Sequence, residues 1–136
     1  MTELENRIFD IVRKIPRGKV MTYGQVAAAA GDSHLSRVVG NTMHKNPVPF
    51  CELARQIGFD CKASVAAKDF EPVPCHRVVN AAGKMGANFG FGGPDVQAKM
   101  LEAEGVEVRG GKVDLKKYGQ SLKTHYRNFL EIAAEL

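Results

Sequence analysis

The first fifteen residues carry apolar side chains at the spacing of an amphipathic helix. They recur at intervals of three and four positions, at Leu4, Ile8, Ile11, Val12 and Ile15. This spacing places them on one helix face. Pro16 and Gly18 follow directly, so we expect the helix to end before them.

Two shorter helices follow, joined by a polar turn. Thr22 lies three residues before Gln25, the spacing of a capping box, and predicts a helix over residues 25–30 that Gly31 ends. A further helix is predicted over residues 34–45. Two helices joined by a short turn with glycine are typical of a helix-turn-helix, whose second helix reads nucleic acid. The alternative is an ordinary helix pair in a small helical domain.

The outer face of the second of these helices favours contact with a partner. Its inward positions are Leu35, Val39 and Met43, and its outward positions are Ser36, Arg37, Gly40, Asn41 and His44. Small residues at 36 and 40 allow close approach of the helix backbone, and Arg37 projects between them as the only long cation. We therefore predict DNA contacts from Ser36, Arg37 and Gly40.

The remaining pattern is less regular. Residues 50–71 have no clean period and predict no defined secondary structure. Val78 and Val79 predict a short strand, which leads into a glycine-rich loop over residues 83–93 that suits close approach of a substrate. Pro94 predicts the start of a helix that runs to Glu104.

The last part of the chain predicts a hairpin and a helix. Residues 106–108 and 110–115 predict two short paired strands, and apolar spacing over residues 122–133 predicts a final helix. The fold expected for residues 1–136 is thus a single domain, mainly α with a short β-hairpin, of the winged-helix-like helix-turn-helix class that binds DNA.

Composition narrows the setting. The 136 residues are 44% hydrophobic and 25% charged, which is ordinary for a soluble globular protein. No apolar run is long enough to span a membrane and no leader pattern begins the chain, so we expect an intracellular monomer, cytoplasmic or, in a eukaryote, nuclear. A net charge of +4 permits binding of nucleic acid.

The three cysteines are Cys51, Cys61 and Cys75, an odd number at irregular spacing. This argues against a disulfide framework and predicts at least one free thiol. Because no paired short-range cysteine or histidine spacing accompanies Cys51 and Cys61, we predict no metal site. No residue pattern implies an organic cofactor.

The segment Pro74–Cys75–His76–Arg77 places a thiol beside two basic side chains. Neighbouring cations lower the pKa of a thiol and populate the nucleophilic thiolate. The alternative is a buried cysteine that only packs. Because neighbours in an extended segment point to opposite faces, joint action of Cys75 and His76 requires a local turn or a bridging water.

Four ordered groups of residues resemble the C-terminal domain of the O6-alkylguanine-DNA alkyltransferases and the related alkyltransferase-like proteins. They are Gly18-Lys19-Val20 with Thr22, Tyr23 and Gln25; Ser36 to Gly40 with Met43, Asn46 and Pro47; Pro74 to Val79; and Gly92-Gly93 with Glu104-Gly105. The resemblance covers most of the chain.

The resemblance implies a catalytic set. Cys75 would accept an alkyl group from guanine O6 in a single displacement that consumes the protein. His76 would act as base through a water molecule, and Glu104 would orient its ring. Tyr23 would hydrogen-bond the flipped base and supply a proton to the departing guanine.

It also implies DNA contacts and a pocket. Arg37 would enter the minor groove and fill the space of the extruded nucleotide in double-stranded DNA containing O6-alkylguanine. Asn46 would support the hinge of the active site, and the pocket residues would include Met43, Val78, Phe91 and Gly92. Arg77 is as consistent with a structural role as with a catalytic one.

Two departures from the family pattern stand out. The stretch between Asn46 and Cys75 is longer, which predicts an insertion at about residues 50–71, and Phe91 stands where many relatives have serine. Three functions remain open. The first is an alkyltransferase that acts once, and the second is a non-enzymatic lesion-recognition protein that recruits another repair pathway. The third is a helix-turn-helix transcription regulator in which Cys75 only packs or senses redox state. Alkyltransferase-like proteins usually replace the acceptor cysteine, which this chain retains.

Overall fold

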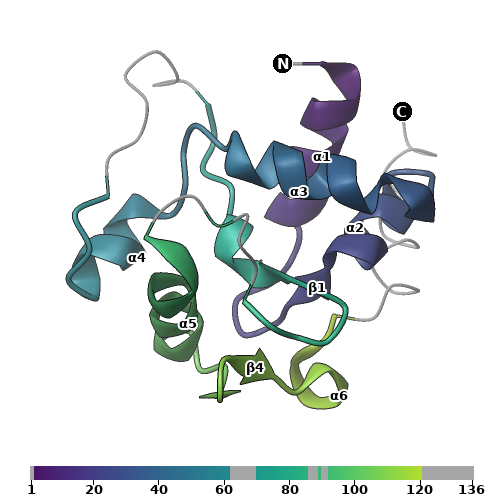
Figure 1. Ribbon diagram of the computed structural model, residues 1–136. Coiled ribbons are helices and arrows are strands. Elements are labelled where there is room, and N and C mark those ends of the chain that lie inside the picture. Colours follow the sequence, from purple (N-terminus) through teal and green to yellow (C-terminus); the bar gives the residue numbers. More distant parts are fainter. Residues whose placement is uncertain (1, 62–69, 86–88, 90–91, 121–136) are drawn as a thin grey trace.

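The computed structural model describes residues 2–61, 70–85, 89 and 92–120 (Figure 1). In chain order the elements are α1 (Glu3–Arg13), β1 (Met21–Thr22), α2 (Tyr23–Ala29), η1 (Ser33–Leu35), α3 (Ser36–His44), α4 (Cys51–Gln56), η3 (Cys75–Arg77), β2 (Val78–Val79), α5 (Gly93–Ala103), β3 (Val108–Arg109), β4 (Lys112–Val113) and α6 (Leu115–Tyr118), where η is a 3-10 helix. The mainly helical fold with a short hairpin is confirmed. The helix predicted over residues 122–133 lies outside the described residues.

Both N-terminal helices begin at capping boxes. The hydroxyl of Thr2 accepts from the backbone N–H of Glu5, whose carboxylate accepts from the backbone N–H of Thr2. Thr22 and Gln25 make the same reciprocal pair, at 3.1 and 2.9 Å. Because the residue after an N-cap already has helical geometry, α2 starts at Tyr23, two residues earlier than predicted.

The predicted helix over residues 34–45 is divided. A 3-10 turn, η1, precedes α3, and the carboxylate of Asp32 caps the turn by accepting from the backbone N–H of His34. Val39 and Met43 are buried as predicted, and Arg37 is exposed. The prediction of an outward Gly40 was wrong: the residue is buried, whereas Asn41 and His44 of the same predicted face are exposed.

Two features of the described residues were not predicted: a helix at the start of the irregular stretch and a parallel strand pair. Residues 51–56 form α4, which the sequence did not predict. Strand β2 pairs with β1 in parallel, with Met21 opposite Val78 and Thr22 opposite Val79. This pairing sets the start of α2 beside the segment that contains Cys75.

The hairpin differs slightly from its prediction. Strands β3 and β4 pair antiparallel, with Val108 opposite Val113 and Arg109 opposite Lys112, so the pairing lies nearer the Gly110–Gly111 turn than expected. The short helix α6 follows.

Two apolar clusters are formed by the described residues, and β2 contributes to both. Val78 belongs to the larger cluster, with buried residues of α1, α2 and α3, whereas Val79 belongs to a smaller one with Leu101, Val106 and Val113. The opposite directions of successive strand residues explain this division. Figure 1 shows α4 and α5 on one side of η3 and α1 to α3 on the other. No helix among the described residues is long and apolar enough to cross a membrane.

Candidate functional site

Cys75 begins a single 3-10 turn, η3, between Pro74 and the strand β2. This is the local turn that joint action of Cys75 and His76 requires. Both residues are buried, and the Gln97 side chain of α5 fastens the turn by donating to the carbonyls of His76, at 3.1 Å, and Val78, at 2.9 Å. Sequence reasoning missed Gln97, because its helical position gives no sign that its amide faces a backbone segment.

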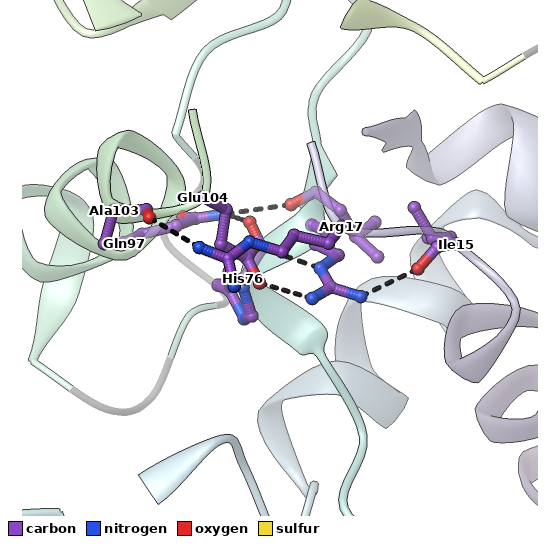
Figure 2. A network of polar contacts seen from close by, with 8 residues as sticks. Ile15, Arg17, His76, Gln97, Ala103 and Glu104 are labelled. Atoms are coloured by element: carbon purple, nitrogen blue, oxygen red, sulfur yellow. Dashed lines mark hydrogen bonds and ion pairs between the residues drawn. The ribbon is translucent and has the colours of Figure 1, made fainter. Parts of the chain in front are cut away.

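Glu104 joins the site from the C-terminal end of α5. Its Oε1 atom lies 2.7 Å from His76 Nε2 and 3.0 Å from Arg77 Nε, and its Oε2 atom accepts from Arg77 Nη2. Arg77 also donates through Nη1 to the carbonyl of Ile15, at 2.8 Å. Figure 2 shows Ile15, His76 and Glu104 within one network of polar contacts. The structure therefore brings His76 and Glu104 together, as the resemblance implied, and gives Arg77 a place in the same network.

The charges in this network follow from burial and hydrogen bonding. Burial would raise the pKa of Glu104, but hydrogen bonds from His76 and Arg77 outweigh it and lower that pKa to about 2. Burial lowers the pKa of His76, and the hydrogen bond to Glu104 only partly opposes this effect. The imidazole is therefore neutral at pH 7. Its Nδ1 atom is buried without a hydrogen-bond partner among the described residues and can receive a proton.

The electrostatic prediction for Cys75 was wrong. Burial raises the pKa of its thiol to about 12, and a hydrogen bond with Asn46 offsets this only in part. The expected cations do not act on the sulfur, because the guanidinium of Arg77 is directed to Glu104 and Ile15 and the ring of His76 is neutral. The side chain of Cys75 is thus a protonated thiol at pH 7.

Asn46 connects the end of α3 to the chain before Cys75. Its Nδ2 atom donates to the carbonyl of Val73 at 3.0 Å, and its Oδ1 atom accepts from the backbone N–H of Val48 at 3.0 Å. Such a tie suits the hinge role that the resemblance implied. Met43 and Val78 lie with Cys75 in the larger apolar cluster.

The other predicted residues lie around this centre. Tyr23, the first residue of α2, is half-buried and packs against the larger cluster. Ser36 is half-buried and donates to the carbonyl of Ser33, at 3.1 Å. Gly92 is exposed just before α5, with a φ of 113°. Phe91 lies outside the described residues. Within the described part of the chain no group of three or more histidine, cysteine or acidic residues could hold a metal ion.

Comparison with curated proteins points to one family. The model of the family described as 6-O-methylguanine DNA methyltransferase, DNA binding domain, matches residues 3–106. The methylated-DNA-protein-cysteine methyltransferase of Methanothermobacter thermautotrophicus is 34% identical over 109 residues, which are 80% of this chain and 48% of that protein. The DNA base-flipping protein of Escherichia coli is 35% identical over 115 residues, 82% of this chain and 70% of that protein.

Solved structures agree with this. S. pombe Atl1, crystallised with damaged DNA containing O6-carboxymethylguanine, has a TM-score of 0.66 and 30% identity, covering 89% of this chain and 97% of Atl1. M. tuberculosis OGT in complex with DNA has a TM-score of 0.58 and 27% identity, covering 77% of this chain and 50% of OGT. The chain spans about half the length of the methyltransferase from M. thermautotrophicus. Because the family model matches residues 3–106 and the E. coli relative is 35% identical, the chain belongs to the family of the 6-O-methylguanine DNA methyltransferase DNA-binding domain.

Proposed function

We propose that this protein binds double-stranded DNA containing O6-alkylguanine and transfers the alkyl group once, irreversibly, to Cys75. The observation that carries the proposal is the buried arrangement of Cys75 on a turn with His76, whose ring is held by Glu104 at 2.7 Å. A nucleophile, a base and a group that orients the base are the parts of an activated-nucleophile site.

The transfer balances without a cofactor. The Sγ atom of Cys75 forms a bond to the alkyl carbon as the bond from that carbon to guanine O6 breaks. The thiol proton passes through a water molecule to the neutral imidazole of His76. The carboxylate of Glu104 stabilises the resulting imidazolium, which later returns its proton to Tyr23 or to solvent. A proton from the hydroxyl of Tyr23 or from water reaches the departing guanine, which restores an ordinary base.

Access to the lesion requires base extrusion, because the O6 substituent lies within the stacked duplex. Arg37 is exposed on α3, the second helix of the helix-turn-helix, and would occupy the space that the base leaves. The flanking Ser36 would contact the DNA backbone. The crystal structures of Atl1 with damaged DNA and of OGT with DNA support DNA binding by this fold.

A second candidate is recognition of the flipped lesion without transfer. It is favoured by the thiol of Cys75, whose pKa burial raises to about 12, because such a sulfur is a poor nucleophile until a base acts on it. The relative named as a DNA base-flipping protein is consistent with either candidate.

Intact-protein mass after incubation with a duplex containing O6-methylguanine tests the choice. Alkyl transfer predicts a gain of one methyl group on the Cys75 peptide, absent with an undamaged duplex and absent in Cys75→Ala. The matched control Cys51→Ser should be methylated like the wild type. Selective binding of the damaged duplex without a mass gain would reject transfer and support recognition alone. Equal affinity for both duplexes without a mass gain would reject both candidates and favour a helix-turn-helix regulator.

A further inference from the structure

Residues 50–61, the first described part of the insertion predicted at about residues 50–71, contact the site near both ends of this segment. The ring of Phe50 lies 5.5 Å from that of His76, centroid to centroid, and the guanidinium of Arg77 lies 5.0 Å from the Phe50 centroid. Near the other end, the ring of Phe59 lies so close to Gly92 that an added Cβ atom would be 2.9 Å from its Cε2 atom. The position of this segment is therefore coupled to the catalytic turn and to the start of α5.

The same segment brings two thiols together. Cys51 begins α4 and Cys61 closes the segment, and their Sγ atoms lie 2.8 Å apart while both cysteines are free. Two hydrogen bonds hold the residues after α4 against the helix. The backbone N–H of Phe59 donates to the carbonyl of Ala54 at 3.0 Å, and Arg55 Nε donates to the carbonyl of Cys61 at 3.2 Å. Sequence spacing alone gave no sign of this pair.

The two thiols differ in access. Cys51 is half-buried and lines a pocket of about 600 Å³ that also borders Arg77 and Glu104. Cys61 is only 1% exposed, and its burial together with the hydrogen bond to Cys51 raises its pKa to about 12. An oxidant from solution would therefore meet Cys51 first, and Cys61 would respond from inside. This is the arrangement of an attacking and a resolving thiol.

We propose that Cys51 and Cys61 are a redox modification site that forms an internal disulfide by exchange with low-molecular-weight disulfides of the glutathione class. The thiolate of Cys51 attacks oxidised glutathione, forms a mixed disulfide and releases one reduced glutathione. The sulfur of Cys61 attacks the Cys51 sulfur, and the second glutathione leaves as a thiol that takes up the proton of Cys61. Two protein thiols become one disulfide, one glutathione disulfide becomes two thiols, and Cys75 stays reduced.

The new bond would close a ring from Cys51 to Cys61 and so fix Phe50 and Phe59 against the site. This second part of the proposal predicts that the oxidised protein melts at a higher temperature than the reduced protein. Formation of this disulfide needs no DNA and does not depend on alkyl transfer.

The test is incubation of the full chain with oxidised glutathione, alkylation of the remaining thiols after the chain is unfolded in denaturant, and non-reducing peptide mass spectrometry. The expected product has lost two hydrogen atoms, contains a peptide pair linked through Cys51 and Cys61, and carries the alkylating label only on Cys75. Dithiothreitol should restore three labelled cysteines. A stable glutathione adduct without the internal bond, a bond that includes Cys75, or three unreacted thiols would each overturn the proposal.

Two variants keep the outcome clear. Cys75→Ser should form the internal disulfide as the wild type does, and its melting temperature should rise on oxidation. Cys51→Ser, whose substitution is at a half-buried position, should form no internal disulfide and show no such rise. An unchanged melting temperature in oxidised Cys75→Ser would contradict the claim that the bond fixes the segment. Because neither readout uses alkylated DNA, failure of methyl transfer leaves this result standing.

Discussion

The carboxylate of Glu104 lies 2.7 Å from the Nε2 atom of His76, although 28 positions separate the two residues in the chain. Both side chains are buried, and the same carboxylate accepts from Arg77. The end of α5 and the turn that carries Cys75 are therefore joined by a charge network within the protein interior. The carboxylate of Glu104 and the guanidinium of Arg77 each need the other, because a buried charge without its partner is strongly destabilising.

Replacement Glu104→Gln should lower the free energy of unfolding by about 3–5 kcal/mol, because the buried guanidinium of Arg77 loses its counter-charge. Urea unfolding measures this. The matched control is Glu107→Gln, whose carboxylate pairs with Arg109 in an exposed ion pair. That change should alter stability by about 1 kcal/mol or less. Equal effects at the two positions would contradict the view that burial makes the Glu104 network critical.

Stability should fall as the solution is acidified, in two stages. Because folding lowers the pKa of His76, the unfolded chain binds a proton more readily, and stability present above its ordinary pKa of 6.5 is lost below it. The pKa of Glu104 falls from 4.5 to about 2 on folding, so its contribution is lost as the pH drops through that lower range. Urea midpoints at several pH values measure both. In His76→Gln the first stage should flatten, and an unchanged slope between pH 7 and 5 would contradict the assignment.

Gln97→Met should destabilise the protein by about 1–3 kcal/mol, because the carbonyls of His76 and Val78 lose their donor while they stay buried. Methionine keeps most of the volume, so the effect reports on hydrogen bonding. Thermal unfolding measures it, with the exposed Gln56→Met of α4 as the control. If transfer occurs, its rate should fall as well, because the turn that carries Cys75 is less firmly held.

Local sequence signals predicted the elements that local chemistry determines. The reciprocal hydrogen bonds of Thr22 with Gln25 and the burial of Val39 and Met43 follow from spacing within one helix. The helix α4 was missed because it is short and because only Ala54 among its residues is buried. Its sequence therefore lacks the regular spacing of apolar residues that predicts a helix.

The parts that sequence reasoning missed depend on contacts between distant segments. The pKa of Cys75 was predicted to fall because His76 and Arg77 are its neighbours, but Arg77 turns to the carbonyl of Ile15 and to Glu104. Parallel pairing of β1 with β2 likewise joins segments whose relationship has no local signature. The residues of the candidate site were thus found through the family pattern, whereas their electrostatics required the fold.

The turn before α5 offers a paired test of close packing. Gly92 and Gly93 both have positive φ, at 113° and 79°, but an added Cβ at Gly92 would lie 2.5 Å from Val96 Cγ2, whereas one at Gly93 meets no atom within 4 Å. Alanine at either site strains the backbone by about 1–3 kcal/mol. Gly92→Ala should add about 1–3 kcal/mol for the contact with Val96 and Phe59. Thermal unfolding of the two variants measures the difference, and equal stabilities would show that the contact is absent in solution.

Arg37→Ala should separate base extrusion from chemistry. If Arg37 fills the space of the flipped base, the variant should react with alkylated duplex at least about tenfold more slowly. A tenfold slower rate corresponds to an activation free energy that is higher by about 1.4 kcal/mol. Its reaction with free O6-benzylguanine should be unchanged, because a free base needs no extrusion. Single-turnover transfer rates on both substrates measure this. Lys99→Ala, an exposed cation on α5, controls for the loss of one charge and should leave both rates close to those of the wild type. Equal losses of Arg37→Ala on duplex and free base would instead place the side chain in the structure of the pocket.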